Sequence, residues 1–310
     1  MRRLALLVTC ALVVGGCGLG EGDKRGRAGA ELRVTRDFGR AELGKAELER
    51  LSESSTVMRL LRSEFEVQTR FGGRFVQSID GLAGRGEGGR RDWFYFVNGL
   101  DASVGATEYG LSPGDRVQWD HRNWEAAMRV PAIVGAYPEP FEHGRDGKRF
   151  PVRLECDDVR SRACEEVKRS LGRSGIATSG GTLGAGSVTE TIRVVVALWE
   201  QAKVVRGAAL IEEGPARSGV FARFAEDGRS LALLGEDGRP LRRVRPGDGT
   251  GIVAATRPEE EQIVWVVTGL DDAGVEAAAR ALEEKDLSGA FAVAAGRRGV
   301  EKLPLISKEQ

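Results

Sequence analysis

The sequence is short of the residue types that dominate metal centres and nucleic-acid interfaces. Its 310 residues include two histidines and four cysteines, and aromatic residues make up 6%. The 46 basic side chains balance 46 acidic ones, so the formal net charge is zero. A balanced chain lacks the long-range positive field that nucleic-acid binding requires, and we expect no nucleic-acid partner. With no Cys-x-x-Cys or His-x-x-x-His grouping, we also expect no metal site.

Motifs of hydrolases and nucleotide-binding proteins are missing as well. The sequence has no Gly-x-Ser-x-Gly elbow, and neither histidine lies in a catalytic strand-to-loop pattern. The glycine-rich stretch 180–186 lacks the third glycine of a dinucleotide fingerprint and the Lys-Ser/Thr pair of a phosphate loop. We therefore predict no catalytic residues and no enzyme activity.

The N-terminus has the pattern of an export signal. Two arginines precede an apolar run over residues 4–14, which is too short for a transmembrane helix, and no later run reaches that length. The run ends in Val-Gly-Gly-Cys at positions 14–17, which resembles the lipobox of bacterial lipoproteins. The resemblance implies a signal peptide over residues 1–17 and a diacylglyceryl group on Cys17; the alternative is an ordinary secretory leader.

A lipid on Cys17 would place the rest of the chain outside the cytoplasm. Two or more acyl chains give stable anchoring, so we expect the extracytoplasmic face of the cell membrane, with that membrane as a partner. Residues 18–30 are glycine-rich and charged, which predicts a flexible tether. Beyond the anchor, Cys156 and Cys164 are an even pair in an oxidising compartment, and we predict that they form a disulfide.

Residues 31–130 carry the signals of a β-rich first domain. Alternating apolar residues predict strands, and Ser55 or Thr56 is a candidate cap for a short helix that carries Leu60 and Leu61. Asn98-Gly99 is the preferred pair for a tight hairpin, because both residues tolerate positive φ. The predicted strands are 31–38, 75–79, 93–97 and 116–119.

Several of these segments together resemble the transcobalamin C-terminal-like domain family, a small β-grasp-like module of exported bacterial proteins. The resemblance is carried by residues 75–81, 93–99, 105–111 and 114–119 and covers about a third of the mature chain. It implies a β-grasp-like fold for the first domain. It also implies a corrinoid such as cobalamin as a candidate ligand, although nothing in the chain itself demands a cofactor.

Aromatic side chains of the first domain supply the candidate ligand-binding residues. In strand 93–97, Trp93 and Tyr95 share one face, whereas Phe94 and Phe96 share the other. One face must be core; the other is either an exposed patch for a ligand or partner, or is covered by the second domain. His121 could act as a ligand or base, or as a hydrogen-bonding residue at a strand end. The candidates are Trp93, Tyr95, Tyr109, Trp119, His121 and Trp124.

Prolines and scattered glycines place the domain boundary in residues 131–150, which we predict to be a linker. Residues 151–305 alternate strand and helix signals, including a strand at 152–156, a helix at 159–171 capped by Asp157 or Asp158, and a flexible loop at 172–187. The predicted fold class is therefore α+β / α/β, with a small β-grasp-like N-terminal domain followed by a mixed-sheet α/β domain of unknown function.

These features predict a non-catalytic, membrane-anchored lipoprotein that binds a small ligand or a partner at the cell envelope. Two alternatives stay open. One is capture of a corrinoid and its delivery to the subunits of an uptake transporter. The other is envelope adhesion or assembly.

Overall fold

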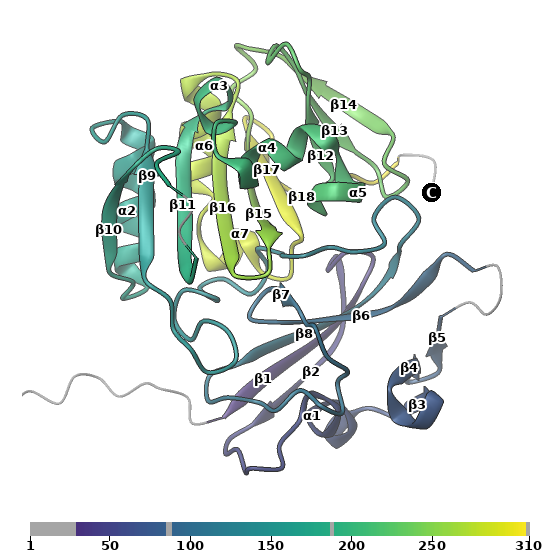
Figure 1. Cartoon of the computed structure of the whole chain (residues 1–310). Coiled ribbons are helices and arrows are strands. Elements are labelled where there is room, and N and C mark those ends of the chain that lie inside the picture. Colours follow the sequence, from purple (N-terminus) through teal and green to yellow (C-terminus); the bar gives the residue numbers. More distant parts are fainter. Residues whose placement is uncertain (1–28, 85–88, 187–188, 308–310) are drawn as a thin grey trace, which may run out of the picture.

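The fold is taken from a computed structural model, which describes residues 29–84, 89–186 and 189–307. The predicted signal peptide, Cys17 and most of the predicted tether lie outside these residues. Within the described ranges, no helix is both long enough and apolar enough to cross a membrane. The predicted fold class is confirmed, because helices and strands are combined in two successive sheet-based units (Figure 1).

The N-terminal unit is a five-stranded sheet with a short helix packed on one face. The strand order is β2-β1-β8-β6-β7, with β1 and β8 parallel. The helix begins after Thr56, whose side chain accepts a hydrogen bond from the backbone of Arg59. The elements are β1 (Ala30–Arg36), β2 (Ala41–Leu48), α1 (Val57–Glu64), β3 (Val67–Arg70), η1 (Phe71–Gly73), β4 (Phe75–Ile79), β5 (Leu82–Ala83), β6 (Arg91–Val97), β7 (Leu100–Asp101) and β8 (Arg116–Asn123).

The C-terminal unit is a seven-stranded mixed sheet in the order β10-β9-β11-β16-β15-β17-β18. Helices α2 and α6 cover one face, and a three-stranded sheet with short helices covers the other (Figure 1). The elements are β9 (Val152–Cys156), α2 (Arg162–Arg173), β10 (Thr178–Thr182), β11 (Thr191–Leu198), α3 (Trp199–Ala202), α4 (Arg206–Ala209), η2 (Leu210–Glu213), α5 (Pro215–Ser218), β12 (Ala222–Phe224), β13 (Leu231–Leu234), β14 (Pro240–Val244), β15 (Gly251–Glu259), β16 (Gln262–Gly269), α6 (Asp272–Arg280), α7 (Glu284–Leu287), β17 (Ala292–Gly296) and β18 (Gly299–Leu303).

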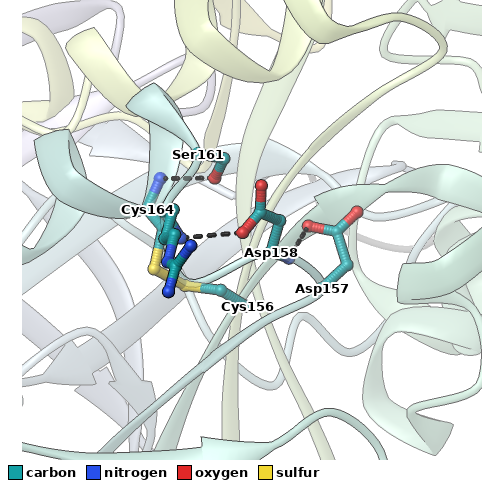
Figure 2. The surroundings of a disulfide bond; sticks show 6 residues. Cys156, Asp157, Asp158, Ser161 and Cys164 are labelled. Carbon is teal, nitrogen blue, oxygen red and sulfur yellow. Dashed lines mark hydrogen bonds between the residues drawn. A yellow bond between two sulfur atoms is a disulfide. The ribbon is translucent and has the colours of Figure 1, made fainter.

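The predicted disulfide is confirmed. Cys156 at the end of β9 is joined to Cys164 in the first turn of α2, with their Cα atoms 6.0 Å apart (Figure 2). The cap of this helix is Ser161, whose hydroxyl accepts from the Cys164 backbone at 3.2 Å. Asp157 and Asp158, which the sequence suggested as caps, instead accept backbone hydrogen bonds inside the preceding turn (Figure 2).

The predicted loop 172–187 contains an edge strand, β10, which pairs in parallel with β9. Its central residues are glycines, which explains why the sequence showed no strand signal. The reason for glycine is close approach: a Cβ atom on Gly181 would lie 2.0 Å from Nε of Arg153 on the neighbouring strand.

The segment predicted as a linker joins the two units but is not an exposed connection. Its apolar side chains enter the cores of the C-terminal unit, with Val134 and Phe141 on one side of the large sheet and Ile133 on the other. Two cis peptide bonds precede Pro138 and Pro140 and shape this compact segment. The two units are therefore packed together along the segment that connects them.

The face of the N-terminal sheet opposite α1 packs against the C-terminal unit. The ring of Phe38 lies edge-on to Phe221 at 4.8 Å and to Phe291 at 5.2 Å. Phe96 also contacts Phe291, and Phe94 packs against the same cluster. Of the two sequence-based interpretations of the Phe94/Phe96 face, the structure supports coverage by the second unit.

Candidate functional site

A cleft of about 1060 Å³ lies between the two units. One wall comes from the N-terminal unit and is built by the turn at 36–40, strand β5, Arg91 and His121. The opposite wall comes from the β13–β14 turn and residues 304–307. Its volume lies at the upper end of the range for small-molecule sites.

The buried side chain of Asp120 holds the turn at 36–40, which forms part of the first wall, through hydrogen bonds. One carboxylate oxygen accepts the backbone N–H of Phe38 at 3.0 Å, and the other accepts that of Gly39 at 2.8 Å and the hydroxyl of Thr35 at 2.6 Å. These bonds hold three consecutive residues, Asp37, Phe38 and Gly39, in the left-handed region with φ of 57°, 60° and 72°. Such a run is costly for residues that carry a Cβ, so the carboxylate is what maintains this turn.

The same carboxylate is fully buried, and its burial raises the pKa of Asp120 to about 6. The bonds from Thr35 and the Gly39 backbone, followed by the Arg122 cation, oppose that rise. Lys302 of β18 supports the turn from the other unit by donating to the carbonyl of Gly39 at 2.9 Å. The wall therefore depends on contacts from both units.

The charges that line the cleft are mostly paired. Asp37 forms ion pairs with Arg36 and Arg91. Arg40 differs, because it donates to the carbonyl of Lys302 at 2.8 Å, and no described carboxylate lies within ion-pair distance of its guanidinium. Burial lowers the pKa of Arg40, and the carboxylates of Asp37, Glu236 and Glu301, which lie nearby but beyond ion-pair distance, oppose that fall. The guanidinium keeps its charge at neutral pH. A partly desolvated cation without a direct counter-ion favours an anionic group in the cleft.

His121 lines the same cleft at the back of the first wall. It is 5% exposed, and its ring packs on Trp93 with the centroids 5.1 Å apart. Burial, followed by the Arg91 cation, lowers the pKa of His121, which favours the neutral imidazole at pH 7. Among the described residues, Nε2 of His121 has no hydrogen-bond partner. This atom is closed off from solvent, so His121 contributes to the cleft through the exposed edge of its ring and not through Nε2.

The cleft also has an apolar side. Leu241 on β14 and Ile306 beyond β18 are large apolar side chains that stay exposed at its edge, and Leu82 of β5 lies on the opposite wall. A cation on one part of the lining and apolar side chains on another suit a ligand that combines an anionic group with an apolar body.

The aromatic residues predicted to bind a ligand lie mostly in the core instead. Trp93, Tyr109 and Trp119 are buried against α1, and Tyr95 stacks on Trp119 at 4.9 Å. Trp124 is half-buried and pairs with Arg90 through its backbone. Of the six candidates only His121 lines the cleft, because the other side chains of β6 and β8 on this face pack the N-terminal core.

The sequence did not predict that Arg40 would line a ligand-binding cleft. Arg40 follows a turn with no recognisable ligand-binding motif, and the β13–β14 turn lies nearly 200 residues later. The only local signal was Asp120-His121, which the sequence analysis singled out for His121 alone.

One group of described side chains has the composition of a metal site. The donor atoms of Glu139, Glu142 and His143 all lie within 4.8 Å of one another. The imidazole of His143 already pairs with the Glu139 carboxylate, which also accepts the His143 backbone N–H at 2.9 Å. The hydrogen bond that the imidazole donates to the Glu139 carboxylate raises the pKa of His143. The pair therefore links two residues of the connecting segment, Glu139 and His143, through both side chain and backbone.

Comparison with known proteins identifies part of the N-terminal unit. Residues 54–123 match DUF4430, a domain of unknown function. The match begins just before α1 and ends with β8, so it includes Asp120 and His121. Among curated proteins, none matches this sequence.

Two solved structures are similar to about a third of the chain. A protein from Ruminococcus gnavus ATCC 29149, provisionally described as metal-binding, is 15% identical with a TM-score of 0.26; the alignment covers 31% of this chain and 96% of that one. Haptocorrin in complex with Cbi is 15% identical with a TM-score of 0.26, over 32% of this chain. The aligned region spans about a quarter (26%) of the haptocorrin chain.

Proposed function

We propose that this protein is a non-catalytic, lipid-anchored extracytoplasmic lipoprotein that binds a small amphiphilic anion in the cleft between its two units. The observation that carries the proposal is the cation of Arg40, which is partly buried in the cleft lining and hydrogen-bonded to a carbonyl rather than to a carboxylate. The neutral imidazole of His121 adds no second cation to the same wall. Leu241 and Ile306 would contact the apolar body of the ligand.

The extracytoplasmic location is supported by the disulfide and by the leader. A disulfide between Cys156 and Cys164 persists in oxidising compartments, which agrees with export. Acylation of Cys17 then follows from the lipobox-like pattern at residues 14–17. Fatty-acid labelling of cells that express the wild type or Cys17→Ala tests this half of the proposal. Label that persists in the variant would exclude Cys17 as the anchor.

A corrinoid is the second candidate ligand, favoured by the size of the cleft. At about 1060 Å³ the cleft lies at the upper end of the size range for small-molecule sites, which suits a ligand as large as a corrinoid. In that case the protein would capture a corrinoid for an uptake transporter. Cyanocobalamin and cobinamide therefore belong in the ligand panel beside octanoate and octyl phosphate.

Binding is tested by the shift in thermal midpoint and by calorimetry. We expect a probe that binds to stabilise the wild type in proportion to ligand concentration. Arg40→Gln keeps a donor for the Lys302 carbonyl but removes the charge, so it should weaken anion binding about tenfold or more. Arg40→Lys should retain part of the affinity. Arg280→Gln, on the exposed face of α6, is the matched control and should bind as the wild type does. Equal binding by wild type and Arg40→Gln would contradict the assigned site.

A further inference from the structure

The tip of the β3–β4 hairpin exposes large apolar side chains that do not line the cleft. Phe71 is 81% exposed, and Phe75 on the other strand of the hairpin is 38% exposed. Val104 is 44% exposed and lies in the loop that is joined to this hairpin by the ion pair between Glu108 and Arg74. Isolated exposed apolar residues are ordinary, but two of these lie on one hairpin and the third on the loop paired with it, and we treat them together as one apolar patch.

Phe71 is also held in a backbone conformation that its side chain disfavours. Its φ is 53°, and Gly72 and Gly73 follow with φ of 70° and 93°. Glycine or asparagine would occupy the left-handed region at lower cost than a bulky aromatic residue. Since the ring of Phe71 is largely exposed, the fold gains little packing in return. Strain of this kind is informative at sites that contact something outside the chain.

Three arginines lie on or beside the hairpin, together with the carboxylate of Glu108. Arg74 is 76% exposed, and its guanidinium lies 3.6 Å from Glu108. Arg70 stands directly across the hairpin from Phe75 and donates to the side chain of Gln77, while Arg62 approaches Thr69. Apolar side chains with a rim of arginines match the chemistry of an anionic lipid surface, where rings enter the headgroup region and cations meet phosphates.

The patch is small for a protein partner, because a stable protein interface buries about 800 Å² on each side and three partly exposed side chains offer much less. It is adequate as a supplementary contact for a body that is already tethered. The described chain begins at β1, at the lower left of the molecule as drawn, and the β3–β4 hairpin lies at the lower right (Figure 1). The dozen or so residues between Cys17 and Ala30 can span at most about 40 Å.

We propose that the tip formed by Phe71, Phe75 and Val104 inserts into the headgroup region of an anionic membrane and orients the body on the surface to which Cys17 anchors it. This inference rests on the proposed lipid anchor. A lipid chain restricts the distance of the body from the membrane, and the tip selects which side of the body faces it. The cleft, which lies between the two units, then stays accessible from the solvent.

The test uses the chain from residue 17 to residue 310, produced without acyl groups and with its disulfide formed. Its sedimentation is measured with phosphatidylcholine vesicles that contain or lack phosphatidylglycerol. We expect binding to the anionic vesicles that weakens with salt. Phe71→Gly should reduce this binding about tenfold while stability is unchanged or raised, because glycine tolerates the backbone conformation. Val159→Ser, which changes a residue 70% exposed beside α2, is the matched control and should bind as the wild type does.

A second measurement tests whether the side chain at position 71 enters the lipid headgroup region. With Phe71→Trp, the introduced indole should shift its emission to the blue and be quenched by brominated lipid when anionic vesicles are added. Wild-type binding by Phe71→Gly, or an unquenched indole, would overturn the inference. Fatty-acid labelling of Cys17 separates the two proposals. If Cys17 is acylated but the unlipidated chain does not bind vesicles, only the tip contact is refuted. If the tip binds vesicles but Cys17 is not acylated, only the lipid anchor is refuted.

Discussion

The carboxylate of Asp120 accepts the backbone N–H of Phe38 at 3.0 Å, across 82 residues of sequence. This bond connects a central strand of the N-terminal sheet to the turn that forms one wall of the cleft. It also positions the Phe38 ring between Phe221 and Phe291 of the other unit. One buried side chain thus couples the shape of the cleft to the packing of the two units.

Replacing Asp120 by asparagine should loosen this turn. The amide has one acceptor oxygen, and its NH₂ group would face a backbone N–H that now lacks a partner. We expect a loss of about 2–3 kcal/mol of unfolding free energy, measured by urea titration. Asp157→Asn, which affects one exposed local hydrogen bond, should cost less than about 0.5 kcal/mol. Comparable losses in the two variants would contradict the role assigned to Asp120.

The raised pKa of Asp120 predicts a dependence of stability on pH. The folded carboxyl titrates near 6 and the unfolded one near its model value of 3.8, so the folded state binds the proton more tightly. The contribution of Asp120 to the free energy of unfolding is fully present below pH 4. It is lost, by about 3 kcal/mol in all, as the pH rises through 6. Unfolding free energies from pH 4 to 7 should show this decline, and Asp120→Asn should remove it. A wild-type profile that matches that of the variant would refute the assignment.

The pair of Glu139 and His143 predicts a pH effect in a higher range. Because the folded pKa of His143 is raised, its stabilising contribution is present below pH 6.5 and is lost as the pH rises through the folded value. The ring is partly exposed, so we expect about 1 kcal/mol or less. Nuclear magnetic resonance titration of the imidazole should give a pKa above 6.5 in the wild type and a lower one in Glu139→Gln. An unchanged value would show that the pair does not interact in solution.

Removing the disulfide should destabilise the C-terminal unit. The bond closes a short loop, with a sequence separation of 8, for which the chain-entropy model gives about 2–3 kcal/mol. The double variant Cys156→Ala with Cys164→Ala should therefore unfold at lower urea than the wild type. Mass spectrometry of the exported wild type should show a deficit of two hydrogens. Two free thiols would indicate that the bond does not form in the cell.

The aromatic contact between the units predicts that they unfold together. Phe38→Ala removes a buried ring, which typically costs about 3–5 kcal/mol. Hydrogen exchange measured by mass spectrometry should show faster exchange in both units, including β17 beside Phe291. Leu43→Ala, at an exposed position on β2, is the control and should leave exchange nearly unchanged. Faster exchange confined to the N-terminal unit would mean that the units are energetically independent.

Local patterns in the sequence were sufficient for most of the strands. Alternation located β1, strand-forming residues located β4 and β6, and Asn98-Gly99 formed the expected tight turn with φ of 52° and 75°. Residues 199–213 form three short helical segments, α3, α4 and η2. Inside α4, a Cβ atom on Gly207 would lie 2.6 Å from Val264, a neighbour more than 50 residues away that no local pattern contains.

By itself, the sequence determined which segments alternate, where the tight turns lie and which two cysteines could pair, because these depend on neighbouring residues or on composition. Only the tertiary structure decided that Phe94 and Phe96 are covered, that Trp93 and Trp119 are core, and that Arg40 lacks a carboxylate partner among the described residues. Burial and charge pairing depend on which surfaces meet in space. Here those surfaces come from segments separated by up to about 260 residues, such as Arg40 and Lys302.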